Sequence, residues 1–215
     1  MKLPVLTSFI VFLFILQHHI RKGKKAQEQQ ENAFWNREYS ANNVRKQSLD
    51  DLSFITFHAK PFYPLTLLGA ESCPEFLERN PEVKNILSRL LFLEEQKIVN
   101  LTEYTNTDLK FKYGVANLNI LTEYDTNYNE LITLLHNYGS ILEQDSYHEQ
   151  ALKVLEYAVS IGTDISGTYM LCAKIYQETN QYSKLEQLKK EAENISTSRK
   201  DSILRKLQEF HSYNN

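Results

Sequence analysis

The residues of this chain best suited to catalysis or metal binding are its six histidines and two cysteines. Nucleophilic and metal sites need such residues at short, fixed spacings or beside a partnering carboxylate. Cys73 and Cys172 instead lie far apart without a histidine at ligand spacing, and Cys172 falls in an apolar helical pattern typical of a core residue. The chain also lacks a phosphate-binding glycine loop, a nucleophile elbow and a zinc-protease helix. We therefore predict no enzyme, no metal ion and no cofactor.

The first residues of the chain carry its clearest positional signal. Leu3 to Ile20 contains no Asp, Glu, Lys or Arg, and as a helix it would span about 27 Å, close to the ~30 Å hydrocarbon core of a bilayer. A basic cluster follows directly, made of Arg21, Lys22, Lys24 and Lys25. Such cations favour the cytoplasmic side and an anionic lipid surface. We predict a single-pass transmembrane anchor at residues 1–20, a cell-membrane location, contact of the basic cluster with the lipid bilayer and a cytoplasmic body.

A cleaved secretory signal is the alternative interpretation of the same residues. The strongest apolar part, Leu3 to Leu16, has the length of a signal-peptide core. However, only Lys2 and the amino terminus place positive charge before it, and no small-x-small cleavage site follows Leu16. The pattern favours an uncleaved anchor.

Residues 21–47 are predicted to continue as a basic juxtamembrane stem helix. The stem is basic while the whole chain has a formal net charge of −3, so the residues after the stem form an acidic body. An acidic body argues against a nucleic-acid partner. The basic stem can serve lipid contact, or its cations can simply set the topology. It also holds the only tryptophan, Trp35, next to Phe34. Exposed aromatic side chains are unfavourable, so we expect Trp35 to dock on the chain's own body, on a partner or at the membrane interface.

Residues 48–128 are predicted to form an irregular and helical middle region. Ser53 to His58 alternates enough to be extended, and Asn80-Pro81 combines a capping residue with a proline at a helix start. Thr105 to Asp108 offers caps for a short helix that Gly114 would end.

From about residue 130 an apolar helical pattern recurs with a period of about 34 residues, the length of a helix-turn-helix repeat. The first unit has Leu135, Tyr138, Gly139 and Leu142, then Ala151, Leu155 and Ala158; the second has Tyr169, Cys172, Ala173 and Tyr176, then Tyr182, Leu185 and Ala192. This pattern resembles the tetratricopeptide repeat family, in which small residues let paired helices approach closely. The resemblance implies two such hairpins over residues 129–195.

The last segment, residues 196–215, is predicted to be a capping helix. Its apolar residues Ile203, Leu204 and Leu207 lie on one side, where they would cover the final hairpin. The predicted fold class is therefore all-α: an N-terminal transmembrane helix, then a helical domain that ends in tetratricopeptide-like hairpins and a capping helix.

Most of the chain also resembles small uncharacterised membrane-anchored proteins of low-GC Gram-positive bacteria. The stem string from Phe34 through Asn42 and the later Tyr113-Gly114 stretch carry this resemblance. It implies no activity.

The tetratricopeptide resemblance implies a concave surface built from the first helix of each unit. The residues that carry over to this surface are His136, Ser140, Glu143, Met170, Lys174 and Gln177. Their mixture of polar, charged and soft apolar side chains suits a peptide or protein partner. We predict a membrane-tethered protein–protein interaction module, an adaptor or scaffold, with Trp35 as a further contact. The alternative is a structural subunit of a larger membrane assembly without groove binding, and an enzyme of unrecognised type is a distant third.

Overall fold

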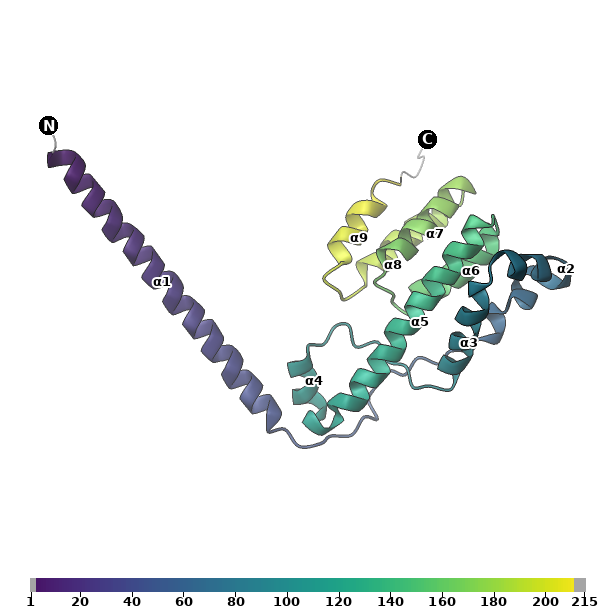
Figure 1. Ribbon diagram of the computed structural model, residues 1–215, viewed down its shortest axis with the longest axis horizontal. Helices are drawn as coiled ribbons and strands as arrows, with labels where there is room; N and C mark the ends of the chain where they lie inside the picture. The colour runs from purple at the N-terminus through teal and green to yellow at the C-terminus, as the bar shows by residue number, and fades with distance from the viewer. Residues whose placement is uncertain (1–2, 211–215) are drawn as a thin grey trace. The chain divides into compact units, whose positions relative to one another are not determined.

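The computed structural model describes residues 3–210, and side chains from residue 12 to residue 210 (Figure 1). These residues form α-helices, two 3₁₀ turns and an isolated bridge between Phe54 and Val99, and they contain no β-strand. The all-α prediction is confirmed for this described part. The chain divides into two compact units, one made of Met1–Ser48 with Thr105–Leu118 and the other of Leu49–Tyr104 with Asn119–Asn215.

The first unit is built on α1 (Leu3–Asn42), which is one unbroken helix. Across the part of the chain that the structure describes, no helix has both the length and the apolar character needed to cross a bilayer. The predicted transmembrane anchor therefore has no support in the structure. Residues 1–2 and the side chains of residues 3–11, which belong to that anchor, lie outside the described set.

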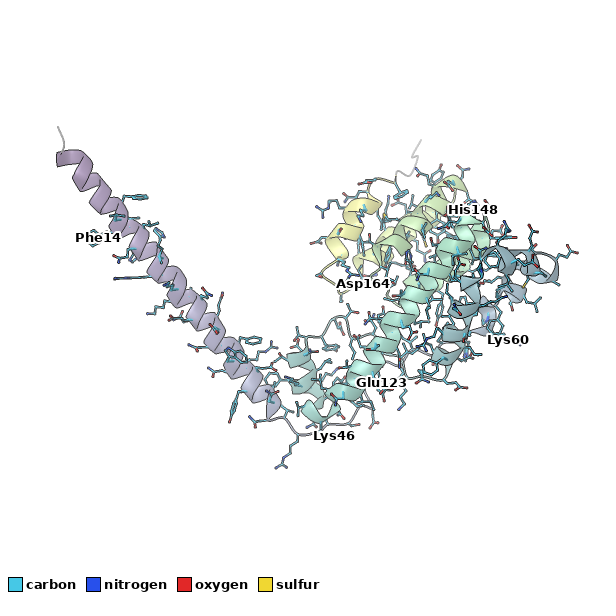
Figure 2. All side chains as sticks on the ribbon, in the orientation of Figure 1. Phe14, Lys46, Lys60, Glu123, His148 and Asp164 are labelled. Atoms are coloured by element: carbon cyan, nitrogen blue, oxygen red, sulfur yellow. The ribbon has the colours of Figure 1, made fainter. Side chains whose placement is uncertain are left out.

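The stem part of α1 is helical, as predicted, and ends at Asn42. Its described side chains are largely exposed, including the basic cluster Arg21, Lys22, Lys24 and Lys25. Phe14, labelled on α1 in Figure 2, is 69% exposed. Trp35 is 58% exposed and makes an edge-to-face contact with Phe34. The stem aromatic residues therefore present free apolar surface.

The end of α1 packs against α4 (Asn106–Tyr113) through charged and polar side chains. Glu38 accepts hydrogen bonds from Lys110 and, at 2.7 Å, from Thr107 Oγ1. The bond from Lys110 is the main reason why the pKa of Glu38 lies below its usual value. Arg37 Nη2 lies 2.5 Å from Asp108 Oδ1. Contacts from Arg37 and Glu38, two adjacent residues of α1, thus fix how α1 lies against α4.

The predicted caps of α4 are confirmed. Thr105 and Asp108 form a reciprocal capping box at its start, and Gly114 follows its last residue with a φ of 82°. A Cβ atom at Gly114 would lie 2.3 Å from the Arg45 carbonyl oxygen, so only glycine fits this position. Residues 105–118, assigned to the middle region from sequence, therefore pack with the end of the stem.

The second unit begins with a bridge-forming segment and two helices and continues as a helical array (Figure 1). Its helices are α2 (Pro64–Arg79), α3 (Glu82–Glu94), α5 (Leu118–Gln144), α6 (His148–Ser160), α7 (Ser166–Glu178), α8 (Tyr182–Glu193) and α9 (Lys200–Leu207). α2 and α3 attach to the start of the array through specific contacts. The Arg89 guanidinium on α3 makes bonds of 2.6 and 2.8 Å to the Glu130 carboxylate on α5, and Phe76 on α2 packs edge-to-face on Tyr147.

The helices α5 and α6 form one hairpin and α7 and α8 form a second with the same pattern of buried residues. Leu135, Gly139 and Leu142 are buried on α5, and Tyr169, Ala173 and Tyr176, each 34 positions later, are buried on α7. Ala158 and Ala192 repeat the pattern on α6 and α8. Cys172 is fully buried, as predicted. The predicted 34-residue period is therefore present in the core of the structure.

The turn inside each hairpin also repeats. Ser146 and Asn180 adopt positive φ values of 65° and 57° at equivalent positions. The next backbone amide then reaches back five residues: Tyr147 N donates to Leu142 O at 2.8 Å, and Gln181 N donates to Tyr176 O at 2.7 Å. This is the bond pattern of a Schellman helix end, which satisfies carbonyl groups that the helix leaves free. Both first helices therefore stop by the same mechanism.

Within the segment predicted to be a capping helix, residues 200–207 form α9, which packs on α7 and α8, and residues 211–215 lie outside the described residues. Its buried residues Ile203 and Leu207 lie 34 positions after Tyr169 and Ala173, so α9 repeats the apolar pattern of α5 and α7 once more. The array therefore ends on a helix that resembles the first helix of a third unit.

Gly139 on α5 lies directly beneath the Leu155 side chain of α6. A Cβ atom there would lie 2.5 Å from Cγ and Cδ2 of Leu155 on α6. Gly139→Leu should therefore destabilise the chain by about 1–3 kcal/mol through overpacking. Gly23→Ala is the matched control, because a Cβ at Gly23 meets nothing within 4 Å. Chemical denaturation with a helical signal measures both variants, and an unchanged unfolding midpoint for Gly139→Leu would contradict this packing.

Candidate functional site

The six residues that the tetratricopeptide resemblance singled out lie on the two first helices of the array. His136, Ser140 and Glu143 are on α5, and Met170, Lys174 and Gln177 are on α7. We call this set the A-face. All six are partly or fully exposed. Trp35 belongs to the other unit and is exposed on α1.

Two contacts across α5 and α7 bring members of the A-face together. Lys174 Nζ lies 2.5 Å from Glu143 Oε1, although the two residues are 31 positions apart in the chain. The hydrogen bond to Glu143 is the main reason why the pKa of Lys174 is raised. The Glu143 side chain is only 11% exposed, whereas that of Lys174 is 48% exposed. The pair therefore fixes the carboxylate firmly and leaves the ammonium group facing solvent.

His136 forms the second contact between the two helices. Its Nδ1 atom lies 3.2 Å from Thr168 Oγ1, and a Cβ atom at Gly167 would lie 2.7 Å from the imidazole ring. The absence of a side chain at Gly167 thus makes room for the ring against α7. Burial lowers the pKa of His136, because the charged imidazolium loses hydration there.

Ser140, Met170 and Gln177 are half-buried on the same two helices. The Ser140 hydroxyl accepts a bond of 3.3 Å from Gln144 Nε2 on its own helix. The A-face therefore has two fixed polar contacts and three side chains that are half exposed beside them.

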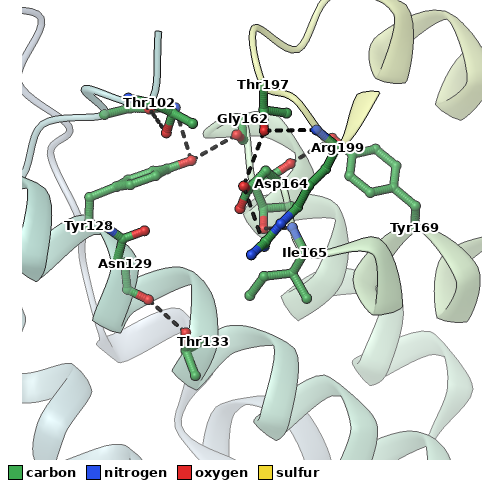
Figure 3. Close-up of polar contacts among 12 residues, drawn as sticks. Thr102, Tyr128, Asn129, Thr133, Gly162, Asp164, Ile165, Tyr169, Thr197 and Arg199 are labelled. Atoms are coloured by element: carbon green, nitrogen blue, oxygen red, sulfur yellow. Dashed lines mark hydrogen bonds and ion pairs between the residues drawn. The ribbon is translucent and has the colours of Figure 1, made fainter. Parts of the chain in front are cut away.

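A cavity of this unit contains none of the residues predicted from sequence. It is a cavity of about 570 Å³ lined by residues from segments 100–103, 159–164 and 191–197, and we call it the loop cavity. The second and third segments comprise the ends of α6 and α8 and the connections that follow them in the two hairpins. Figure 3 shows Gly162 and Asp164 of one connection beside Thr197 and Arg199 of the other.

A hydrogen-bond network fixes the wall of the loop cavity. Asn100 Nδ2 donates to the Tyr128 hydroxyl at 2.9 Å, and that hydroxyl donates to the Gly162 carbonyl at 2.8 Å (Figure 3). The Tyr169 hydroxyl donates to the Thr163 carbonyl at 2.9 Å. Gly162 itself has a φ of 82°, which suits glycine. Both tyrosines are buried, so the connection after α6 is held from two sides.

The loop cavity is acidic. Glu103, Asp164 and Glu191 line it, whereas lysine, arginine and histidine do not occur among its described lining residues. The negative charge affects nearby groups: burial is the main reason why the pKa of Asp125 is raised, and the charge of Asp164 raises it further. Burial also raises the pKa of Tyr128 and Tyr169, and Asp164 adds to both shifts.

Sequence reasoning missed this cavity because its residues come from helix ends and connections in three separate segments rather than from one helical face. The 34-residue period of the sequence could have indicated the cavity. Gly162-Thr163 and Ser196-Thr197 stand 34 positions apart, so the two connections had to stack if the hairpins did. Within the described residues, no three His, Cys, Asp or Glu side chains gather in a group that could hold a metal ion.

Comparison of the chain with protein-family models, with curated protein sequences and with solved structures gives no match. The two predicted family resemblances therefore stay predictions.

The burial of His136 predicts a pH dependence of stability. With its folded pKa below the ordinary value near 6.5, the unfolded chain takes up a proton that the folded chain does not, so stability falls as the pH drops through and below that value. His136→Gln, which keeps a polar group for Thr168, should therefore lose less unfolding free energy than the wild type between about pH 7.5 and about pH 5.5. Denaturant titrations at several pH values measure this. Parallel profiles for the two proteins would show that His136 is not responsible.

Proposed function

We propose that the chain is a membrane-tethered protein-interaction module whose second unit carries the binding surface. In this proposal residues 1–20 form the anchor, the basic cluster lies at the cytoplasmic lipid surface and the two hairpins are tetratricopeptide-like. The uncharged run from Leu3 to Ile20, followed directly by four cations, supports the anchor and its direction. The A-face supports the binding role.

The contact between Glu143 and Lys174 is the observation that carries the binding proposal. It joins the first helices of both hairpins, so side chains from the two units share one surface. A partner that meets this surface finds side chains that are already ordered, which lowers the entropy cost of binding. The half-exposed ammonium group of Lys174 suits a carboxylate of the partner, and Met170 offers adaptable apolar contact.

The proposal is tested with a photo-reactive residue placed at Ser140 in the full chain in intact membranes. Ser140 lies between His136 and Glu143 on α5, so a partner on the A-face should give a discrete cross-linked adduct from this position. The control position is Lys153, which is exposed on α6. An adduct from Lys153 alone, or none from Ser140, would contradict the proposal.

Charge reversal separates binding from stability. Lys174→Glu puts a second carboxylate beside Glu143 and should remove the Ser140 adduct. It should also destabilise the chain by about 1 kcal/mol or more, because Glu143 is only 11% exposed and loses its cation. The double variant Glu143→Lys with Lys174→Glu restores the attraction between the two positions, so its stability should recover. The cross-linked adduct from Ser140 should still be absent in this double variant, because the charges that face the partner are exchanged. Recovery of the adduct together with stability would mean that the pair serves the fold and not the partner.

The exposed stem aromatic residues favour a structural subunit as the second candidate function. Phe34 and Trp35 are both more than half exposed on α1 and make no contact that would bury them. A larger membrane assembly could cover them. Trp35→Ala distinguishes the two candidates: loss of a membrane complex in this variant, with the Ser140 adduct unchanged, would favour the structural subunit.

The proposed direction of insertion has its own test. A reporter fused after Asn215 should be active only as a cytoplasmic enzyme, because the cations follow the apolar run rather than precede it. Replacing Arg21, Lys22, Lys24 and Lys25 by glutamate should mix or invert the orientation. Alkaline phosphatase activity of the unaltered fusion, which needs export of the reporter, would contradict a cytoplasmic body.

A further inference from the structure

The hydroxyl group of Tyr138 on α5 is buried without a hydrogen-bond partner. The Tyr138 side chain is fully buried, and none of the described residues makes a hydrogen bond to its Oη atom. By contrast, the buried hydroxyls of Tyr128 and Tyr169 each donate to a backbone carbonyl group. A buried hydroxyl that makes no hydrogen bond destabilises a fold, and such exceptions mark redox sites, catalytic sites or positions where another group binds.

Cys73 lies on the face of α2 that meets α5. Asn80 and Asp145 follow Cys73 and Tyr138 by seven positions each, and Asn80 Nδ2 donates to Asp145 Oδ2 at 2.9 Å. Residues seven apart share a face of a helix, so Cys73 and Tyr138 belong to the two faces that this contact brings together. Phe76, one turn after Cys73, is fully buried on the same face.

The thiol of Cys73 is close enough to the Tyr138 hydroxyl for the charge of one group to affect the other. Burial is the main reason why the pKa of Tyr138 is raised, and a negative charge at Cys73 raises it further. Cys73 is a free, half-buried thiol, so small solutes can reach it. Cys172, the only other cysteine, is fully buried. Small reagents therefore meet a single thiol on the folded chain.

We propose that Cys73 is a site of reversible oxidation by a peroxide, and that the oxygen of its sulfenic acid accepts the hydrogen bond that the Tyr138 hydroxyl lacks. The thiolate sulfur attacks one peroxide oxygen, and the S–O bond forms as the O–O bond breaks. The other oxygen leaves as hydroxide or alkoxide and takes up a proton. The sulfur is thereby oxidised from thiol to sulfenic acid, and the peroxide is reduced to water or an alcohol.

Two equivalents of a small thiol reverse the change. The first forms a mixed disulfide with Cys73 as water leaves, and the second releases the Cys73 thiol as the two small thiols leave as a disulfide.

The oxidised chain gains a bond between α2 and α5 that the reduced chain lacks. The sulfur of a thiol is a weak acceptor, so the Tyr138 hydroxyl obtains a good acceptor only after oxidation. Because this bond must break before the sulfenic acid reacts further, Tyr138 also protects Cys73 from over-oxidation. The inference rests neither on the A-face nor on the membrane anchor, so each proposal can fail alone.

The test uses the purified full chain, hydrogen peroxide and dimedone, a cyclic diketone that traps sulfenic acids. After brief oxidation, catalase removes the peroxide, dimedone is added after increasing delays, and mass spectrometry locates the adduct. The wild type should carry one adduct, at Cys73, and Cys73→Ser should carry none. Absence of an adduct at Cys73, or equal trapping at Cys172, would overturn the proposal.

The Tyr138→Phe variant tests the role of the hydroxyl. Its trappable fraction should decay roughly tenfold faster than that of the wild type, as expected when one hydrogen bond no longer holds the sulfenic acid. Tyr157→Phe is the matched control, because the Tyr157 hydroxyl contacts the Thr56 carbonyl, and its decay should match the wild type.

The reduced protein gives a second, independent readout. Reduced Tyr138→Phe should unfold at the same denaturant concentration as the wild type or at a higher one, because the substitution removes a hydroxyl that makes no bond. Equal decay of the sulfenic acid in wild type and Tyr138→Phe overturns the proposal. A lower unfolding midpoint for reduced Tyr138→Phe also overturns it, because the hydroxyl would then already have a partner before oxidation.

Discussion

The close approach of α5 to α6 at Gly139 is the constraint on which the helical array depends. Without a side chain at this position, Leu155 can lie directly against the backbone of α5. Ala173 is fully buried at the equivalent position of α7, where it also keeps the helix surface small. Small residues at these two positions let each second helix lie close to its first helix, and the spacing sets where the following connection begins.

The way in which the first helix of each hairpin ends is a second feature that the two hairpins share. Ser146 and Asn180 take positive φ values that glycine adopts more readily, and both hairpins accept this conformation to form the same five-residue bond. α6 ends in the same way, with the positive φ at Gly162 and a bond of 3.1 Å from Thr163 N to Ala158 O. The end of α8 is different, because Asn194 has a φ of −94° and its backbone N–H donates to the Glu191 carbonyl.

Periodicity made the hairpins and the cap predictable from sequence, because apolar residues at helical spacing report which face a helix buries. The caps of α4 were predictable for a similar local reason, since Thr105, Asp108 and Gly114 act on residues within one helical turn. The contact of Glu38 with Lys110 was not predictable, because it joins residues 72 positions apart through charges that any exposed helix could carry. The loop cavity was not predictable for the same reason. Its acidic residues, Glu103, Asp164 and Glu191, form no recognisable sequence pattern and come together only when the hairpins stack. The A-face residues lie on α5 and α7, and their pairing across the helices came only from the structure.

Residue-resolved amide exchange on the full chain tests the repeated array most directly. The amides of Tyr147, Thr163 and Gln181 each donate the long backbone bond that closes a helix end, at 2.8, 3.1 and 2.7 Å. If α5 to α9 form one array of equivalent hairpins, these three amides should be protected to a similar degree, close to that of the buried helix cores. Rapid exchange at Gln181 with slow exchange at Tyr147 would show that the second hairpin is a frayed extension and would contradict the account of two equivalent units.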